Sequence, residues 1–226
     1  MCGRFALDSS LDELIAHYAV ANNRLPDWAP HWNIAPTMTI PLVIDVVEDN
    51  QRHRTLGPAR WWLTPPWSET LDTPYPTFNA RSESVSTKAS FRQSLAHHRG
   101  VIPARGYFEW KTERSIKTPH YIHEPDGSLM SFAALYTTWR GGASPVVTAT
   151  ILTHPAPESL SHIHPRAPLR LTAEDLIEWL NPLQELDQQQ VDELAGRSQS
   201  LGEGLQAYPV NALRGDGPEL IAPAHS

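Results

Sequence analysis

The middle of the chain alternates short apolar and aromatic runs with turn signals, and this pattern constrains the fold more than any other feature. Each run has the length of a β-strand and is rich in β-branched or aromatic residues. Turn signals at Arg105-Gly106, Asp126-Gly127 and Gly141-Gly142 separate several of them. The sequence therefore predicts an antiparallel or mixed β-sheet, in which the strands 101–103 and 107–110 are joined by the turn at Arg105-Gly106. The predicted strands are 40–47, 101–103, 107–110, 120–123, 129–135 and 146–152.

Helices are predicted on either side of this region. Ser10 followed by Glu13 is a capping-box signature, and apolar residues then repeat at helical spacing, which predicts a helix over 11–19. Thr172, followed by two acidic residues, predicts a helix start, and its apolar positions are Leu176, Ile177 and Leu180. Residues 84–97 and 188–195 are also helix-compatible, whereas 26–36 and 153–168 are predicted to be loops.

The chain of 226 residues can bury a sizeable core and has no internal repeat or clear internal boundary. We expect a single α+β domain over residues 1–226, with the acidic segment 172–226 covering part of it. The single cysteine excludes an internal disulfide and fits a reducing compartment. No signal peptide or membrane span is recognisable, so we expect the protein in the cytoplasm. We also expect a monomer.

The charges are unevenly distributed, which matters for the choice of partner. The formal net charge of −7 argues against nucleic-acid binding. Residues 50–123, however, contain 11 Lys and Arg against 5 Asp and Glu, whereas 172–226 contain 2 against 10. The basic middle could hold a phosphate backbone, because counterion release depends on the local charge. The alternative is an ordinary solvated surface.

The only cysteine is residue 2, where removal of Met1 would leave a free 1,2-aminothiol. An α-amine titrates near pH ~8 and a thiol near ~8.5, so both are partly nucleophilic at neutral pH. With an aldehyde, the amine can form a Schiff base and the thiol can then close a five-membered thiazolidine. With an amide, the thiolate would act as in a cysteine protease. The alternative is that position 2 only requires a small residue.

Three further groups of residues are candidates for a site. Trp61, Trp62 and Trp67 lie among prolines, and exposed rings in a basic segment can stack on single-stranded bases, although core packing is the alternative. Glu109 stands among aromatic residues, where burial would raise its pKa toward values useful for proton transfer; otherwise it faces water. Three histidines in 153–168 suggest a metal, but no cysteine or compact carboxylate cluster joins them, so we expect no metal and no cofactor.

Four separated stretches together resemble the SRAP (SOS-response-associated peptidase) family. The order and separations fit from Cys2 to about Asn211, which is nearly the whole chain. The chain departs from the family pattern at Trp62 (usually Gly), at Arg105 (usually Asp), and at Pro165 and Ala167 (usually Asp and Met). The matching stretches are Met1-Cys2-Gly3-Arg4, Asn33-Ile34-Ala35-Pro36, Phe78-Asn79-Ala80-Arg81 with Ser82 and Glu83, and Pro103 with Gly106 to Trp110; 150–156, His164, Arg166, Pro168 and Val210-Asn211 also match.

The resemblance implies a mixed, barrel-like β-sheet core with flanking helices. It also implies a protein that recognises abasic sites in single-stranded DNA and is covalently joined to them through Cys2. A thiol-peptidase activity that removes Met1 is a further implication, for which a host aminopeptidase is the alternative, and a lyase activity is also expected. By the same resemblance, Cys2 is the nucleophile, Asn79 orients the N-terminus, Glu109 transfers protons, and His164 protonates the sugar oxygen or holds a phosphate. Because of the Pro165 and Ala167 departures, His162 is the alternative to His164. Expected DNA contacts are Arg4, Trp67, Arg81, Arg166 and Thr153.

Three functions therefore remain open from the sequence. The first is an abasic-site sensor that forms a DNA-protein crosslink and associates with the nucleoid when bound. The second is an N-terminal-nucleophile cysteine peptidase that acts on itself or on other polypeptides. The third is a non-covalent module for single-stranded DNA. Loss of Cys2 would abolish the first two activities and leave the third.

Overall fold

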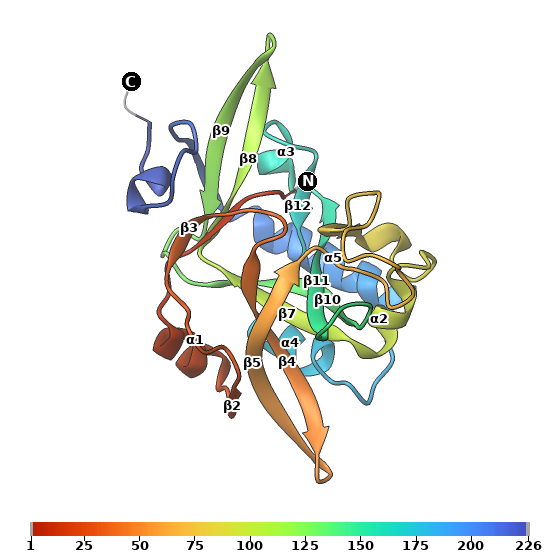
Figure 1. The fold of residues 1–226 in the computed structure, drawn as a ribbon. Helices are drawn as coiled ribbons and strands as arrows, with labels where there is room; N and C mark the ends of the chain where they lie inside the picture. Colours follow the sequence, from red (N-terminus) through yellow and green to blue (C-terminus); the bar gives the residue numbers. More distant parts are fainter. Residues whose placement is uncertain (1, 225–226) are drawn as a thin grey trace.

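A computed structural model describes residues 2–224, whose strands form two sheets with helices packed around them (Figure 1). The larger sheet has the order β12-β11-β10-β7-β4-β5-β2, and the smaller has the order β14-β9-β8-β1-β3. The strands are β1 (Phe5–Leu7), β2 (Asn22–Asn23), β3 (His31–Ile34), β4 (Thr39–Glu48), β5 (Gln51–Trp61), β6 (Asn79–Arg81), β7 (Arg99–Ala104), β8 (Gly106–Glu113), β9 (Ile116–His123), β10 (Met130–Trp139), β11 (Val146–Pro155), β12 (Arg166–Pro168), β13 (Arg170–Leu171) and β14 (Gln206–Pro209). The helices are α1 (Leu11–Tyr18), α2 (Arg92–His97), α3 (Glu158–Ser161), α4 (Ala173–Trp179) and α5 (Gln188–Gly202), with 3-10 turns η1 (Ser82–Ser84) and η2 (Pro218–Ile221).

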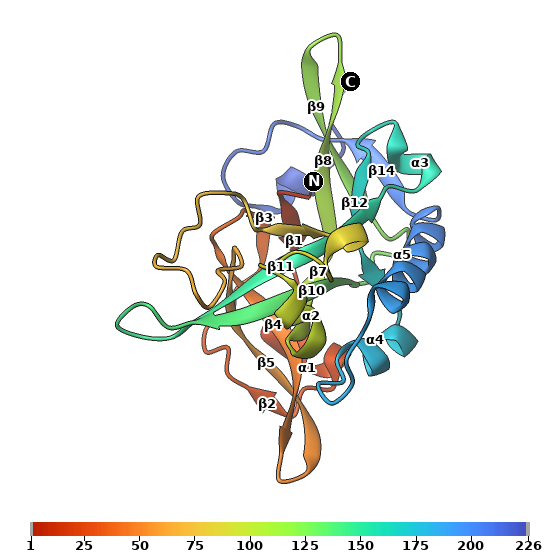
Figure 2. The ribbon, with the colours of Figure 1, turned by 90° about the vertical axis from the view of Figure 1, so that its right-hand side faces the viewer.

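The larger sheet closes on itself. Strands β5, β4, β7, β10 and β11 pair in sequence, and β11 also pairs in parallel with β5 through Thr148↔Arg60 and Ala149↔Trp61. The prediction of a single-domain α+β fold with a mixed, barrel-like sheet is therefore confirmed. Figure 2 shows α4 and α5 beside this sheet. None of the helices within residues 2–224 is long and apolar enough to cross a membrane.

The predicted strands are all present, but the connection predicted at Arg105-Gly106 is wrong. β7 pairs with β10 and β4, whereas β8 pairs with β9 and β1, so the chain passes from one sheet to the other at this point. The Arg105 side chain fixes the crossing by binding Asp8 at 2.6 Å and Glu13 at 2.7 Å. A Cβ atom at Gly106 would lie 2.4 Å from the Tyr121 ring, so only glycine allows this close approach.

The local capping signals predicted helix starts correctly. Ser10 accepts the Glu13 N–H at 3.2 Å at the start of α1, and Thr172 forms a full capping box with Asp175 at the start of α4. Helix α5 continues to Gly202, beyond the predicted end at 195. Of the apolar positions of α4, Ile177 is 62% exposed, whereas Leu176 and Trp179 provide the buried stripe.

Three irregular segments also differ from prediction. Of the helix predicted over 84–97, only 92–97 is helical, because hydroxyl residues such as Thr87 bond locally to the backbone and favour turns. The predicted loop 26–36 contains β3, which pairs with β1. The predicted loop 153–168 contains the end of β11, helix α3 and β12. These short strands depend on partners far along the chain, which local composition does not reveal.

One arginine ties the helices to the sheet. Arg99, at the start of β7, is 4% exposed and donates hydrogen bonds of 2.5–2.7 Å to five backbone carbonyls. These carbonyls belong to α2 and to the end of α4 and the segment after it, where helical carbonyls lack partners within the helix. Burial lowers the pKa of Arg99 to about 10, and the carbonyl oxygens compensate its charge in place of a carboxylate. The acceptors are Leu95, Ala96, Trp179, Asn181 and Gln184.

The N-terminal strand is held in the middle of the smaller sheet. β1 lies between β3 and β8, and the ring of Phe5 packs against Trp61 with centroids 5.1 Å apart. The Phe108 N–H donates to the Arg4 carbonyl at 2.9 Å, which aligns the first residues with β8. The start of the chain is thus fixed beside the strand that carries Glu109.

Candidate active site

Cys2 lies inside the protein and not on a flexible tail. Its side chain is fully buried, and its Sγ donates to the Arg4 carbonyl at 3.7 Å. Burial, and secondly the charge of Glu109, raises the pKa of the Cys2 thiol well above its ordinary value. With Met1 attached, the sulfur is therefore protonated at neutral pH.

Asn79 is brought to Cys2 by the parallel pairing of β6 with β11. Its Nδ2 donates to the Cys2 carbonyl oxygen at 2.7 Å, which fixes the peptide that follows the nucleophile. Its Oδ1 is buried and has no hydrogen-bond partner among residues 2–224. A buried carbonyl oxygen of this kind can accept a hydrogen bond from an incoming or newly formed amine.

Glu109 is buried on β8, and its side chain is directed at the same cluster. Its exposed fraction is 3%, and burial raises the pKa of its carboxyl to about 7. Of the two environments considered from the sequence, the structure shows the buried one. A carboxyl that titrates near neutrality can both accept and donate a proton at physiological pH.

His164 completes the cluster. Its Nδ1 lies 3.6 Å from Glu109 Oε1 and accepts the Arg166 backbone N–H at 3.1 Å. Burial lowers the pKa of His164, so the neutral imidazole is favoured. His162, the alternative in the sequence, is exposed at the end of α3. The structure thus brings His164, and not His162, to Glu109.

The predicted cations occupy different environments. Arg81 is exposed, and Arg4 donates to Asn33 Oδ1 at 3.0 Å. Arg166 is already paired with Glu83 and donates to the Thr153 carbonyl at 2.5 Å. Thr153 is fully buried behind Arg166, so it has no exposed surface for DNA. It is therefore placed to position Arg166.

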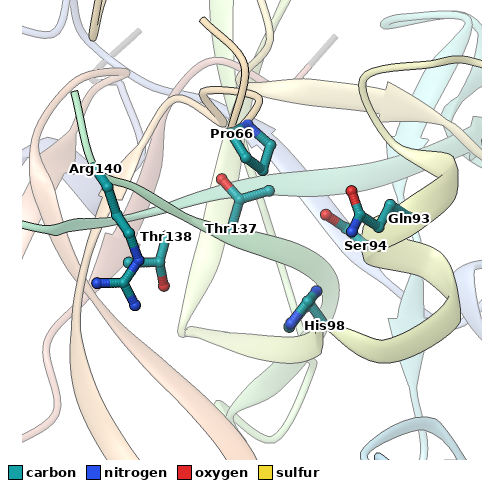
Figure 3. A pocket seen from close by; sticks show the side chains of 7 residues that line it. All are labelled: Pro66, Gln93, Ser94, His98, Thr137, Thr138 and Arg140. Carbon is teal, nitrogen blue, oxygen red and sulfur yellow. The ribbon is translucent and has the colours of Figure 1, made fainter.

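Only one of the three tryptophans singled out in the sequence is a surface platform. Trp61 is fully buried in the core, and Trp62 donates to Thr73 Oγ1 at 2.8 Å, whereas Trp67 is 58% exposed. A pocket of about 220 Å³ lies beside the loop that carries Trp67, between α2 and the end of β10 (Figure 3). It contains none of the predicted site residues. It is lined by Pro66, Gln93, Ser94, His98, Thr137, Thr138 and Arg140.

A larger depression of about 740 Å³ begins at Asn79 and Arg81, and most of its residues were missed by the sequence analysis. Lys88 is exposed, Tyr75 is 50% exposed, and Phe91 lines the same depression. A cation beside aromatic rings suits single-stranded nucleic acid. The net basic charge of residues 50–123 was the only sequence signal, since no recognisable motif joins these three residues.

The histidines of 153–168 do not form a metal site. His154 is buried in β11, where its Nε2 lies 2.9 Å from Ser198 Oγ on α5, and burial lowers its pKa to about 4. Within the described part of the chain, no group of three or more His, Cys, Asp or Glu side chains could hold a metal ion. Arg105, which stands where the family usually has Asp, is neutralised by Asp8 and Glu13.

The fold and the cluster define a class of single-domain α+β proteins in which a thiol beside the amino terminus is buried among a carboxamide, a carboxyl and an imidazole. Residues 1–215 match the sequence model of the family described as SOS response associated peptidase (SRAP). The chain belongs to this family.

Several known proteins are similar to this chain along most of their length. "Abasic site processing protein YoqW" of Bacillus subtilis is 35% identical, covering 98% of this chain and 99% of that protein. "Abasic site processing protein YedK" of Escherichia coli is 31% identical, covering 99% and 100% respectively. The crystal structure of a protein from Bacteroides thetaiotaomicron matches with a TM-score of 0.81 at 22% identity, covering 99% and 100%, and supports the fold.

Proposed function

We propose that the protein recognises abasic sites in single-stranded DNA and, after loss of Met1, is covalently joined to them through Cys2. One observation carries the proposal: four segments distant in the sequence bring Cys2, Asn79, Glu109 and His164 together. The names of the relatives, which are abasic site processing proteins, agree with it.

The first step is formation of a Schiff base. An abasic deoxyribose in its open form is an aldehyde, and the Cys2 amine attacks its carbonyl carbon to give a carbinolamine. Glu109 accepts a proton from the attacking amine and returns one to the carbinolamine hydroxyl, which leaves as water. A pKa of about 7 suits this carboxyl to both transfers. The lowered pKa of His164 favours its neutral form, whose ring N–H can donate a hydrogen bond to the sugar oxygen or to the adjoining phosphate.

The second step closes the ring. The Cys2 sulfur adds to the imine carbon, its proton passes to the imine nitrogen, and a thiazolidine results; the overall change is aldehyde plus aminothiol giving thiazolidine plus water. Because burial favours the thiol over the thiolate, the sulfur must lose its proton as it attacks. Glu109 in its ionised form is the acceptor for this proton. Asn79 holds the Cys2 peptide so that nitrogen and sulfur reach the same carbon.

DNA is held by groups around the cluster. Arg4 and Arg81 contact phosphates, and Trp67 stacks on a base near the lesion. Arg166 reaches a phosphate only by leaving Glu83, whose pKa is lowered chiefly by its hydrogen bond with Arg166. Thr153 supports Arg166 from behind.

We also propose that the cluster removes Met1 itself. In this reaction the Cys2 sulfur attacks the Met1 carbonyl carbon, the acyl group moves from nitrogen to sulfur, and water hydrolyses the thioester, leaving free methionine and the aminothiol. Mass spectrometry of Glu109→Gln protein made without a methionine aminopeptidase tests this step. Retained Met1 in the variant and its loss in the wild type are expected; equal loss in both would refute self-removal.

The test of the main proposal is a denaturing gel with single-stranded DNA that contains one abasic site. Wild-type protein should give a band that survives denaturation, and Cys2→Ala should give none while retaining affinity for the DNA. Intact single strands without the lesion serve as the control. A wild-type protein that binds both DNAs equally and forms no band would instead be a non-covalent binding module, and the proposal would fail.

A further inference from the structure

The hairpin formed by β8 and β9 projects away from the body of the protein (Figures 1 and 2). β1 pairs with the base of β8 and β14 with the base of β9. In the outer part, from Lys111 to Thr118, β8 and β9 pair only with each other among the described strands. Arg114 and Ser115 form its tip with φ of 47° and 71°, as in a tight two-residue turn. This arm begins at the site, since Glu109 lies on β8.

One face of the arm is continuous with the cluster. Side chains alternate along a strand, so Lys111 and Glu113 lie on the same face as Glu109. Residues directly opposite each other across the ladder share a face, so this face also includes residues of β9. We call it the Glu109 face; it consists of Glu109, Lys111, Glu113, Ile116, Thr118 and His120.

The outer end of the Glu109 face is hollowed and carries groups that suit a nucleotide. A depression of about 640 Å³ is lined by Glu113, Arg114, Ile116 and Thr118. Ile116 is 69% exposed, beside the cation Arg114. An apolar side chain next to a cation can contact a base or sugar and a phosphate at the same time.

Lys111 is also available to a phosphate. It pairs with Glu113 at 2.9 Å, and the Glu113 side chain is 69% exposed. Exposed ion pairs of this kind contribute only about 0–1 kcal/mol, so a phosphate can replace the carboxylate. Lys117 carries the same charge but faces the other side of the arm, because it lies opposite Thr112 in the ladder.

We propose that the Glu109 face of the arm binds the DNA strand that leaves the lesion on one side, with phosphates at Lys111 and Arg114. This inference rests on the proposed function and extends its site outward. Four residues separate Glu109 from Glu113, which spans about 13 Å at ~3.3 Å per residue. A stretch of this length can contact a short run of nucleotides on that side of the lesion.

The experiment measures binding to single-stranded DNA containing a tetrahydrofuran abasic analogue, which cannot form a Schiff base. One oligonucleotide has long flanks; two others are trimmed next to the lesion on the 5′ or on the 3′ side. The test variant is Lys111→Gln with Arg114→Asn, because asparagine tolerates the positive φ at the tip. Lys117→Gln is the matched control, since it removes a charge from the opposite face of the same arm.

The expected result has three parts. For DNA that keeps the contacted flank, the plot of log affinity against log salt concentration is less steep for the test variant than for the wild type, by about 1.4. The loss of affinity relative to the wild type is therefore about 25-fold greater at 0.1 M salt than at 1 M salt. For DNA trimmed on that side, the test variant and the wild type bind alike. Lys117→Gln changes neither the salt dependence on the long DNA nor the affinity for the trimmed DNA. Glu113→Gln tightens binding to the long DNA.

Equal losses on all three DNAs, or an equal loss with Lys117→Gln, would overturn the inference. Crosslinking of true abasic-site DNA by the wild type, run in parallel on the trimmed oligonucleotides, separates this outcome from failure of the proposed function. If the wild type crosslinks trimmed DNA but the variants show no dependence on the flank, the arm assignment alone is wrong. If the wild type forms no crosslink on any DNA, both fall.

Discussion

Replacing Glu109 with glutamine should change how stability depends on pH. The folded protein raises the pKa of this carboxyl from 4.5 to about 7, chiefly by burial. The folded state therefore binds the proton more tightly than the unfolded state, and stability falls as pH rises from about 4.5 through 7. A shift of this size corresponds to about 3 kcal/mol, at ~1.36 kcal/mol per pH unit.

Glutamine is close in shape to a protonated glutamate but never ionises. At pH 5, Glu109→Gln and the wild type should unfold at similar denaturant concentrations. At pH 8 the variant should be more stable by about 3 kcal/mol, or roughly 10 °C in Tm for a domain of this size. Other titrating groups are common to both proteins, so they largely cancel in the difference.

The assay is urea unfolding at several pH values between 5 and 8, with Glu113→Gln as the control, since Glu113 lies four residues further along β8 but is exposed. Crosslinking rates measured in parallel should show an inflection near pH 7 that Glu109→Gln removes. If the difference in unfolding free energy between Glu109→Gln and the wild type stays constant from pH 5 to 8, the carboxyl has an ordinary pKa. Its proposed role in proton transfer would then lose its basis.

Three further predictions concern other parts of the molecule. Cys2→Ser cannot form the thiazolidine, so its DNA adduct should survive a denaturing gel only after borohydride reduction; a stable band without reduction would contradict the ring. Trp67→Ala should weaken binding of single-stranded DNA by about 1–3 kcal/mol without changing Tm, because its side chain is exposed. Arg99→Met should destabilise the fold by about 4 kcal/mol in urea unfolding, because five carbonyls lose their donor.

Local signals predicted the parts of the fold that are determined locally. Ser10 and Thr172 mark helix starts because a capping side chain bonds to a backbone N–H only a few residues away. The strand at 40–47 was equally readable, since its run of β-branched residues favours a strand and Ile40 and Val43 are buried in β4. Pairing partners were not readable: the sequence could not show that the chain changes sheets at Arg105, which depends on side chains of Asp8 and Glu13.

In the candidate site too, the sequence identified residues but not their surroundings. The motif resemblance selected Cys2, Asn79, Glu109 and His164, and these four lie in one cluster. Spacing alone could not decide whether Glu109 is buried, because an alternating strand is compatible with either face. Nor could it separate an exposed cation from a paired one; Arg166 is held by Glu83, a contact between residues 83 positions apart.

The complete burial of Cys2 also bears on how the protein survives before it meets a lesion. Peroxides and small disulfides react with exposed thiolates, and this sulfur is neither exposed nor readily ionised. We therefore expect this thiol to be oxidised more slowly than exposed cysteine thiols. Its selectivity comes in part from restricted access, because an electrophile must enter the folded cluster before it can react.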